Sequence, residues 1–289
     1  MAKKSKEKET IRFVTATSLF DGHDASINIM RRILQDAGAE VIHLGHNRSV
    51  SEIVSAALQE GAHAVALSSY QGGHMEFFKY LIDLLKERGC GYVKVFGGGG
   101  GVIIPEEIRE LEAYGVAKIF SPEDGKKMGL KGMIDYMIAA AGEVWFPAID
   151  HDYTKVRQKD PVVLGQLINL AEKAMAGLST DFARIISDLR NISSPTPVVG
   201  ITGTGGAGKS SLVDEFIGRF VNTYQDKSIA VISVDPSRTK SGGALLGDRI
   251  RMNHISNERV YMRSMATRRS RDELSEAIHD AIDIMKAAG

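Results

Sequence analysis

The segment from Ala64 to Gly101, AVALSSYQGGHMEFFKYLIDLLKERGCGYVKVFGGGGG, decides the fold of this chain. It begins with an apolar run at 64–69 that is typical of a fully buried strand, and it continues with a helical pattern at 74–88 that ends before Gly89. A further strand is predicted at 92–96. Because a strand, a helix and a strand in this order join two parallel strands, the segment predicts one unit of a parallel sheet.

The same alternation of strands and helices extends over residues 11–141. The further predicted strands are 11–17, 40–44 and 117–120, and the further predicted helices are 25–37, 50–60, 105–114 and 127–141. Together they predict an α/β fold with a flavodoxin-like, five-stranded parallel sheet that helices cover on both faces. Ligands of such sheets bind outside the carboxyl ends of the strands, so a site is expected in the loops that follow them.

The remaining sequence predicts a helical linker and a second α/β unit. The expected division is a disordered tail at 1–10, a first domain at 11–141, the linker at 142–197 and a P-loop domain at 198–289. In the P-loop domain, VVGIT at 198–202 and SIAVISVD at 228–235 are predicted strands, and 271–287 is a predicted helix. This domain is expected to be incomplete, because the base-reading motif that comes later in GTPases is not in the sequence.

The composition excludes several classes of protein. The 289 residues include 36 basic and 36 acidic side chains, and this zero net charge argues against binding of a polyanion by the whole chain. The single cysteine, Cys90, excludes a disulfide framework and a cysteine-built zinc or iron–sulfur site. No apolar run reaches the roughly 20 residues of a membrane span, and no signal peptide follows the charged N-terminus. We expect a cytoplasmic protein that binds neither nucleic acid nor membrane.

The sequence GTGGAGKS, from Gly203 to Ser210, matches the phosphate-binding pattern GxxxxGK[ST] between a predicted strand and an amphipathic helix. The glycines let backbone N–H groups surround phosphate oxygens, Lys209 can reach the phosphates, and Ser210 can bind Mg²⁺. Asp235 ends the next predicted strand, where a carboxylate can meet the magnesium ion. These residues predict a nucleotide site, and they leave the choice between GTP and ATP open.

The stretch after Asp235 is strongly basic, with nine Lys or Arg against two Asp or Glu between Ser237 and Arg271. It contains Asp248, which follows a glycine-rich loop. One interpretation is a mobile loop that contacts a triphosphate or an acidic partner, and the other is a solvated surface. A nucleic-acid interface is disfavoured, because no aromatic platform is interleaved with the basic residues.

The sequence Asp21-Gly22-His23 follows the first predicted strand, at the edge where ligands are expected. A carboxylate that holds one ring nitrogen of a histidine leaves the other nitrogen free to bind a metal, whereas a turn capped by the aspartate is the structural alternative. The other histidines are scattered, so a single histidine suits a metal that arrives within a macrocycle. Gly72, Gly73 and the run from Gly97 to Gly101 would let such a bulky ligand approach the backbone.

These residues resemble the cobalamin-binding domain of the acyl-CoA mutases, which carries the motifs D-x-H-x-x-G, S-x-L and G-G. The matching positions are Asp21-Gly-His23, Ser68-Ser-Tyr70 and Gly97-Gly98, with Ser26 in place of the motif's glycine and Tyr70 in place of its leucine. The second half is similar to the G-protein chaperones of these mutases through TGTGGAGKSSL (202–212), VDPSRTKSGGALLGDRIRM (234–252) and RSMATR (263–268). The order of the two parts resembles the fused isobutyryl-CoA mutase family.

For the first half, the resemblance implies that His23 is the lower axial ligand to the cobalt of adenosylcobalamin and that Asp21 orients it. Ser68 and the two glycines would line the channel for the displaced nucleotide tail. The positions that the resemblance assigns to cobalamin are Asp21, Gly22, His23, Ser68, Gly97 and Gly98. The bound cofactor would supply the radical chemistry, and the protein would position it.

For the second half, the resemblance implies GTP and Mg²⁺ as ligands, with Lys209 and Asp248 as catalytic residues of GTP hydrolysis. Ser210, Asp235 and Asp248 would surround the magnesium ion. The positions assigned to the nucleotide are Gly203, Gly206, Ala207, Gly208, Lys209, Ser210, Ser211 and Arg251. The basic stretch at 237–271 would form switch regions.

The function that the resemblance implies is the cobalamin-binding and GTPase portion of an isomerase. It would interconvert isobutyryl-CoA and n-butyryl-CoA by a radical rearrangement, and GTP hydrolysis would gate the loading of the cofactor. The implied partners are an acyl-CoA bound by a barrel domain outside this chain, a second copy in a homodimer, and an adenosyltransferase. Two alternatives remain at this point: a stand-alone corrinoid carrier and GTPase chaperone without isomerase activity, and an unrelated pair of domains, namely a flavodoxin-like receiver and an ATPase.

Overall fold

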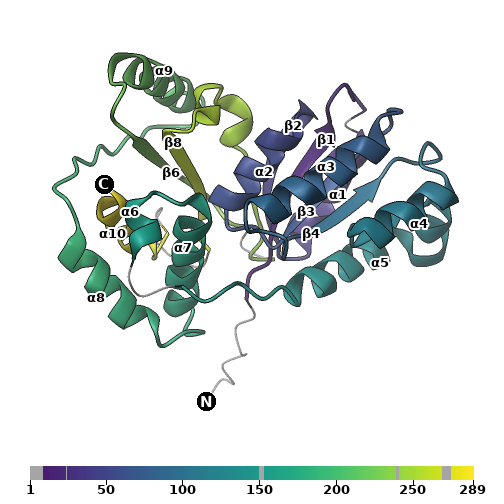
Figure 1. The fold of residues 1–289 in the computed structure, drawn as a ribbon, viewed down its shortest axis with the longest axis horizontal. Coiled ribbons are helices and arrows are strands. Elements are labelled where there is room, and N and C mark those ends of the chain that lie inside the picture. Colours follow the sequence, from purple (N-terminus) through teal and green to yellow (C-terminus); the bar gives the residue numbers. More distant parts are fainter. Residues whose placement is uncertain (1–8, 24, 150–152, 239–240, 269–274) are drawn as a thin grey trace.

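The chain folds into two α/β halves that meet at a buried polar interface (Figure 1). The structure, a computed structural model, describes residues 9–23, 25–149, 153–238, 241–268 and 275–289. Most of the predicted tail, Asp24 and the end of the basic stretch at 269–271 therefore lie outside the described residues.

A parallel sheet of six strands, in the order β5-β4-β3-β1-β2-β7, is the centre of the first half. The five predicted strands are present in the flavodoxin-like order. Their bounds are β1 (Arg12–Ser18), β2 (Glu40–Arg48), β3 (Ala64–Ser68), β4 (Lys94–Gly98) and β5 (Lys118–Phe120). The sixth strand, β7 (Ala244–Leu246), comes from the second half of the chain and pairs with β2, which the sequence did not predict.

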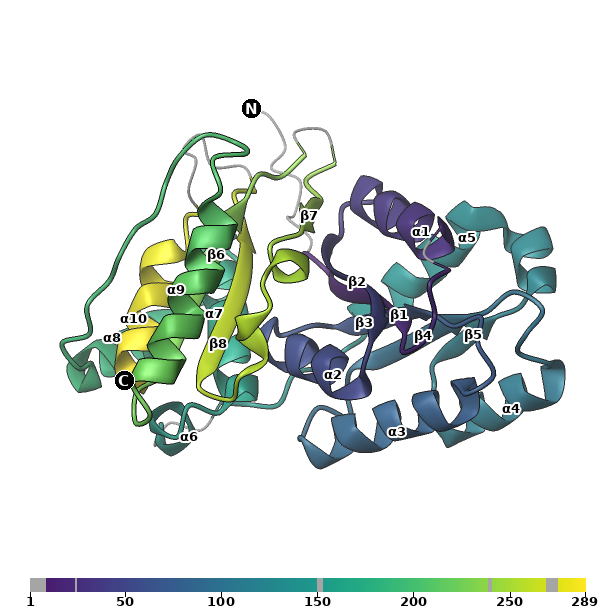
Figure 2. The same cartoon turned by 90° about the horizontal axis from the view of Figure 1, so that it is seen from above.

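Helices cover both faces of this sheet, as predicted (Figure 2). One face carries α2 (Val50–Gln59), α3 (His74–Glu87) and α4 (Pro105–Tyr114), and the other carries α1 (Ala25–Asp36) and α5 (Pro122–Gly142). Neighbouring residues of β1 enter different cores: Phe13 packs with the residues of α1 and α5, and Val14 packs with those of α2 and α3. Buried apolar side chains on both faces of the central strands follow from this coverage, because a parallel sheet with helices on each side buries both of its faces.

Local signals fix the ends of these helices. Gly38, Gly61 and Gly89 have φ angles of +98°, +53° and +74°. This left-handed conformation ends the preceding helices near the positions that were predicted from these glycines. Helix α5 begins at Pro122, before the predicted helix at 127–141, because the Ser121 hydroxyl accepts the N–H of Asp124 and the Asp124 carboxylate accepts the N–H of Ser121. The helix is kinked at Gly129, where φ is +64°. None of the described helices is both long and apolar enough to cross a membrane.

The second half is built on a parallel pair of strands, β6 (Ile229–Asp235) and β8 (Val260–Ala266). Helix α9 (Lys209–Thr223) packs on one face of the pair. Three helices pack on the other face: α7 (Pro161–Met175), α8 (Phe182–Ile192) and α10 (Ile278–Ala288). The shorter elements are α6 (Thr154–Arg157), η1 (Arg249–Arg251) and η2 (His254–Ser256). The helices of the predicted linker are thus a packed layer of the second half.

The predicted strand at 198–202 is wrong, because residues 193–204 form neither a strand nor a helix. Its side chains stay in solvent, with Val198 55% and Val199 78% exposed. An apolar segment becomes a strand only where a neighbouring strand accepts its hydrogen bonds. Among the described residues, β6 pairs with β8 and not with this segment.

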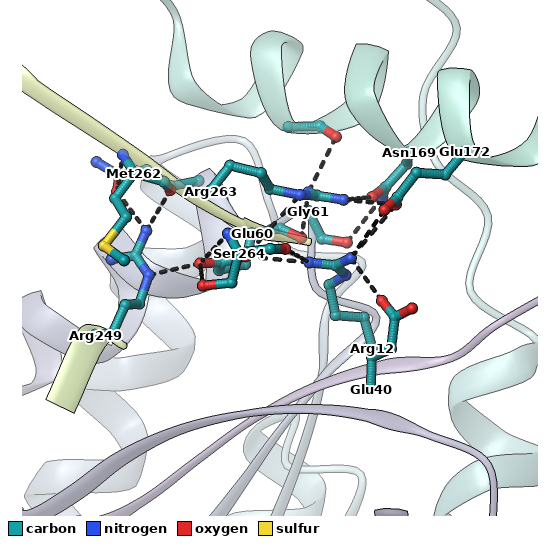
Figure 3. A network of polar contacts seen from close by, with 12 residues as sticks. Arg12, Glu40, Glu60, Gly61, Asn169, Glu172, Arg249, Met262, Arg263 and Ser264 are labelled. Carbon is teal, nitrogen blue, oxygen red and sulfur yellow. Dashed lines mark hydrogen bonds and ion pairs between the residues drawn. The ribbon is translucent and has the colours of Figure 1, made fainter. Parts of the chain in front are cut away.

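Charged side chains fill the interface between the two halves (Figure 3). Glu60, at the end of α2, is fully buried and accepts from Arg12 at 3.1 Å and from Arg249 at 2.7 Å. It also accepts from the backbone N–H and the hydroxyl of Ser264 on β8. A single carboxylate of the first half therefore binds three residues, two of which belong to the second half.

Two more glutamates extend this network. Glu40, at the start of β2, pairs with Arg12 at 2.6 Å and with Arg268 at 2.9 Å. Glu172, on α7, pairs with Arg263 at 2.9 Å, and Asn169 accepts from the same guanidinium at 2.7 Å. Removal of one partner from such a buried lattice leaves a charge uncompensated, which typically costs about 3–5 kcal/mol.

We predict that the Glu40→Gln variant loses stability in a pH-dependent way. Burial raises the pKa of Glu40, but Arg268 and Arg12 outweigh it and hold the pKa at about 2, against 4.5 for an ordinary glutamate. A depressed pKa stabilises the folded state above pH 4.5, and this contribution disappears as the pH falls towards 2. Urea unfolding should therefore show a difference between wild type and variant, on the order of 3 kcal/mol above about pH 5, that shrinks on acidification.

The matched control for Glu40→Gln is Glu215→Gln, because Glu215 forms an exposed ion pair with Arg219. This control should change the free energy of unfolding by less than about 1 kcal/mol. A difference between Glu40→Gln and wild type that stays constant from pH 7 to pH 3 would contradict the prediction.

Candidate functional site

Asp21 and His23 lie in the loop after β1, at the carboxyl edge of the first sheet. The Asp21 side chain is buried, and its Oδ1 atom accepts the backbone N–H of His23 and lies 2.9 Å from His23 Nδ1. Because an ionised carboxylate can only accept, Nδ1 is the nitrogen that carries the proton in this pair. The His23 side chain is 76% exposed, which leaves Nε2 as the nitrogen that can bind a metal.

Asp21 also connects this loop with the one that follows β3. Its second oxygen, Oδ2, accepts the backbone N–H of Tyr70 at 2.6 Å. The ring of Tyr70 lies beside that of His23, with centroids 5.6 Å apart. Tyr70, which stands in place of the family's leucine, thus contacts His23, the candidate metal ligand.

Three strand ends bring the other predicted residues to the same edge. Ser68 pairs with Thr17 on one side and with Gly98 on the other, so the ends of β1, β3 and β4 are level. Ser68 is buried, and its hydroxyl lies 3.4 Å from that of Ser26. Ser26 therefore places a hydroxyl group opposite Ser68, where the motif's glycine would have no side chain.

The glycine run after β4 has more than one cause. A Cβ atom on Gly97 would lie 2.5 Å from both Phe78 and Ile119, and one on Gly99 would overlap the carbonyl oxygen of Ser69. At Gly97 and Gly99 the protein's own packing already requires glycine, so a bulky ligand is not needed to explain these two positions. A Cβ atom on Gly98 would meet its nearest neighbour, the carbonyl oxygen of Phe120, at 3.7 Å, so the protein's own packing does not require a glycine at this position.

The phosphate-binding loop leads directly into α9. Gly206 and Gly208 have φ angles of +79° and +84°, a conformation that other residues rarely adopt. Lys209 donates to the carbonyl oxygens of Gly203 and Thr204 at 2.8 and 2.9 Å. The whole loop is exposed, including the predicted positions Gly203, Gly206, Ala207, Gly208 and Ser211. Its backbone N–H groups and the ammonium group of Lys209 are thus accessible to an anion.

The predicted magnesium residues come together beside this loop. The Ser210 hydroxyl donates to Asp248 Oδ1 at 3.1 Å, and Arg251 donates to the same atom at 2.6 Å. Asp235 accepts the N–H of Gly247, the residue before Asp248, and burial followed by the charge of Asp248 raises the pKa of Asp235 to about 6. Two carboxylates and a hydroxyl are hard oxygen ligands, so this arrangement fits a divalent cation. Among the described residues, no group of three His, Cys, Asp or Glu side chains could hold a metal.

Two arginines of the basic stretch at 237–271 fit neither a mobile loop nor a solvated surface. Arg249 is 6% exposed and Arg263 is fully buried, and each is paired with a glutamate, so neither forms a mobile loop or a solvated surface. The partners Glu60 and Glu172 were not recognised from the sequence. A charged residue within an otherwise apolar segment, such as Arg12 in the first predicted strand, was the signal that could have indicated a buried ion pair.

Comparison with known protein families gives two matches. Residues 11–126 match the B12 binding domain, and residues 164–289 match the methylmalonyl-CoA mutase-associated GTPase MeaB. The first match includes the Asp21–His23 edge of the sheet. The second includes the phosphate-binding loop, both carboxylates beside it, and the helices α7 and α8.

Comparison with curated proteins shows similarity over the whole chain. The chain is 57% identical to the fused isobutyryl-CoA mutase of Geobacillus kaustophilus over 100% of its own length and 27% of that protein. It is also 57% identical to the fused isobutyryl-CoA mutase of Cupriavidus metallidurans over 96% of its own length and 25% of that protein. The chain therefore spans about a quarter of the length of these relatives.

A third relative matches the first half alone. The 2-hydroxyisobutanoyl-CoA mutase small subunit of Aquincola tertiaricarbonis is 31% identical over 47% of this chain, and the alignment covers 98% of that subunit. The half that carries Asp21, His23 and Ser68 thus corresponds to a complete protein chain in this relative.

We predict that Gly97→Ala destabilises the fold and that Gly101→Ala does not. The new methyl group at 97 would overlap Phe78 and Ile119, whereas no atom lies within 4 Å of a Cβ at 101. Overpacking of a core typically costs about 1–3 kcal/mol. Thermal unfolding of both variants measures the difference, and equal stability of the two would show that the core around Gly97 yields to the extra group.

Proposed function

The chain belongs to the family of B12-binding mutase proteins that includes the fused isobutyryl-CoA mutases and the 2-hydroxyisobutanoyl-CoA mutase small subunit, and from this premise we propose that it is the cobalamin-binding and GTPase part of an adenosylcobalamin-dependent acyl-CoA mutase. The observation that carries the proposal is the pair of Asp21 and His23. The buried carboxylate holds Nδ1 of an exposed histidine, which leaves one nitrogen ligand at the carboxyl edge of the sheet.

The residues at this edge fit a corrinoid. His23 would bind the cobalt through Nε2, and Asp21 would fix the ring orientation and raise its basicity as a ligand. Packing does not require the glycine at Gly98, beside Ser68, and its missing side chain would let the cofactor approach the sheet edge. When bound, adenosylcobalamin supplies a 5′-deoxyadenosyl radical that abstracts hydrogen from the substrate.

We propose GTP and Mg²⁺ as the ligands of the second half. The N–H groups of the loop and Lys209 would bind the phosphates, while Ser210, Asp235 and Asp248 would hold the magnesium ion. Arg251, which pairs with Asp248, would contact the nucleotide. GTP hydrolysis would then control the loading of the cofactor.

The whole-protein properties come from the family alone. They are the interconversion of isobutyryl-CoA and n-butyryl-CoA, a substrate-binding barrel outside this chain, a homodimer, a contact with an adenosyltransferase, and a cytoplasmic location. The proposal that acyl-CoA specificity lies in the barrel follows from the same source.

We predict that His23→Ala abolishes the change in the visible spectrum that adenosylcobalamin undergoes when a histidine replaces its own base. Asp21→Asn should weaken binding by about 10- to 100-fold, because the amide is uncharged and its single acceptor oxygen cannot serve both His23 Nδ1 and the N–H of Tyr70. The control is His279→Ala, which removes an exposed histidine of α10. An unchanged spectrum on mixing cofactor with the unmodified chain would refute the cobalamin assignment.

We predict that Lys209→Ala weakens the binding of a fluorescent GTP analogue by at least about tenfold, or about 1.4 kcal/mol. The variant removes the ammonium group that neutralises the phosphates. Lys227→Ala, which removes an exposed lysine paired with Asp226, should bind the analogue as the wild type does. Equal affinities of Lys209→Ala and wild type would count against a phosphate-binding role for this loop.

A further inference from the structure

Asp248 belongs to the nucleotide site, but the structure anchors it in the other half of the chain. It follows β7 by two residues, and β7 pairs with β2 from Glu40↔Ala244 to Ile42↔Leu246. β7 is not a strand of the sheet formed by β6 and β8. The backbone before Asp248 is therefore fixed by hydrogen bonds to the cobalamin-binding half.

The residues after Asp248 also contact the cobalamin-binding half, although Arg249 donates in addition to the carbonyl oxygen of Met262 on β8. Arg249 is buried and donates to Glu60 at 2.7 Å and to the Gln59 side chain at 2.6 Å. Ile250 packs against Gly45 of β2, where a Cβ atom would lie 2.7 Å from its side chain. Residues on both sides of Asp248 thus contact β2 and the end of α2.

The other two proposed magnesium ligands lie on a strand and a helix of the nucleotide half. Asp235 ends β6, and Ser210 lies in the first turn of α9. The distance of 3.1 Å between the Ser210 hydroxyl and Asp248 therefore joins groups that are anchored in different halves. A small shift of one half against the other would change this distance and with it the geometry of the cation site.

We propose that the cobalamin-binding half completes the magnesium site of the nucleotide half, with Arg249 as a positioning residue that, held by Glu60, fixes the carboxylate of Asp248. This inference rests on the proposed function, because it takes Ser210, Asp235 and Asp248 as the groups that hold Mg²⁺. Arg249 itself acts through its neighbour and contacts neither the nucleotide nor the cation.

The test measures how much Mg²⁺ the full 289-residue chain needs to bind a fluorescent GTP analogue. In Arg249→Met, the Mg²⁺ concentration that gives half of the maximal Mg²⁺-dependent increase in analogue binding should rise by about 10- to 100-fold. Substitutions of other residues that orient metal ligands have effects of this size. Binding in the presence of EDTA should stay unchanged, because the loop N–H groups and Lys209 supply it. Arg249→Lys, which keeps a positive charge beside Glu60, should recover part of the loss, and Arg219→Met is the control at an exposed arginine.

A second variant is designed to displace the carboxylate of Asp248 without a change to Arg249 or Glu60. In Gly243→Ala the new methyl group would overlap the carbonyl oxygen of Gln35 and lie 2.8 Å from that of Ala39, so β7 should separate from β2. It should raise the Mg²⁺ requirement as Arg249→Met does. Gly125→Ala, which has nothing within 4 Å of its Cβ, is its control.

Hydrogen exchange on the unmodified chain gives a test that needs no variant. Addition of Mg²⁺ to the nucleotide-bound chain should slow amide exchange at 41–46 and 244–251, in both halves. An unchanged Mg²⁺ requirement in the folded variants, or the absence of this protection, would overturn the inference while leaving nucleotide binding intact. Failure of the unmodified chain to bind the analogue at all would instead overturn the proposed GTP site.

Discussion

The buried carboxylate of Glu60 is the interaction on which the arrangement of the two halves depends. It lies at the end of α2 with no exposed surface, and it receives Arg12, Arg249 and Ser264 from three separate elements. A carboxylate without water is stable only when its oxygens are fully occupied by donors. The two halves supply these donors jointly, so the energetics of Glu60 favour one relative position of the halves.

The first sheet uses its two edges for different purposes. At the carboxyl edge, Asp21 and His23 are positioned for a ligand, and the histidine remains exposed. At the opposite edge, Arg12 and Glu40 begin their strands and enter the ionic network with Glu60. The strands β1 and β2 run between these two edges, so the same elements carry the ionic network at one end and the loops of the candidate site at the other.

Local sequence predicted the first half well, because its signals are local. The apolar strands, the glycines at 38, 61 and 89, and the loop around His23 each report on a few neighbouring residues. The prediction of the strand at 198–202 was wrong for the opposite reason. VVGIT has the composition of a strand, but strand formation requires a partner, and residue composition carries no information on whether a partner is adjacent.

The glycine run illustrates how one pattern can have several causes. Sequence alone attributed all five glycines to a ligand, whereas Phe78, Ile119 and the Ser69 carbonyl account for two of them. These neighbours belong to other elements of the fold. They are too far from the glycines in the sequence for a local pattern to reveal the contact. The number of glycines was visible in the sequence, and the reason for each one was not.

The sequence by itself determined which chemical groups this chain offers: a histidine with a nearby carboxylate, a phosphate-binding loop with its lysine and serine, and two acids at the ends of later segments. The tertiary structure alone decided which of them meet. Asp248 reaches Ser210 because β7 joins the sheet of the other half and because Glu60 holds Arg249. Such contacts depend on burial and on pairing between distant segments, and the free energy of both is set only when the whole chain has folded.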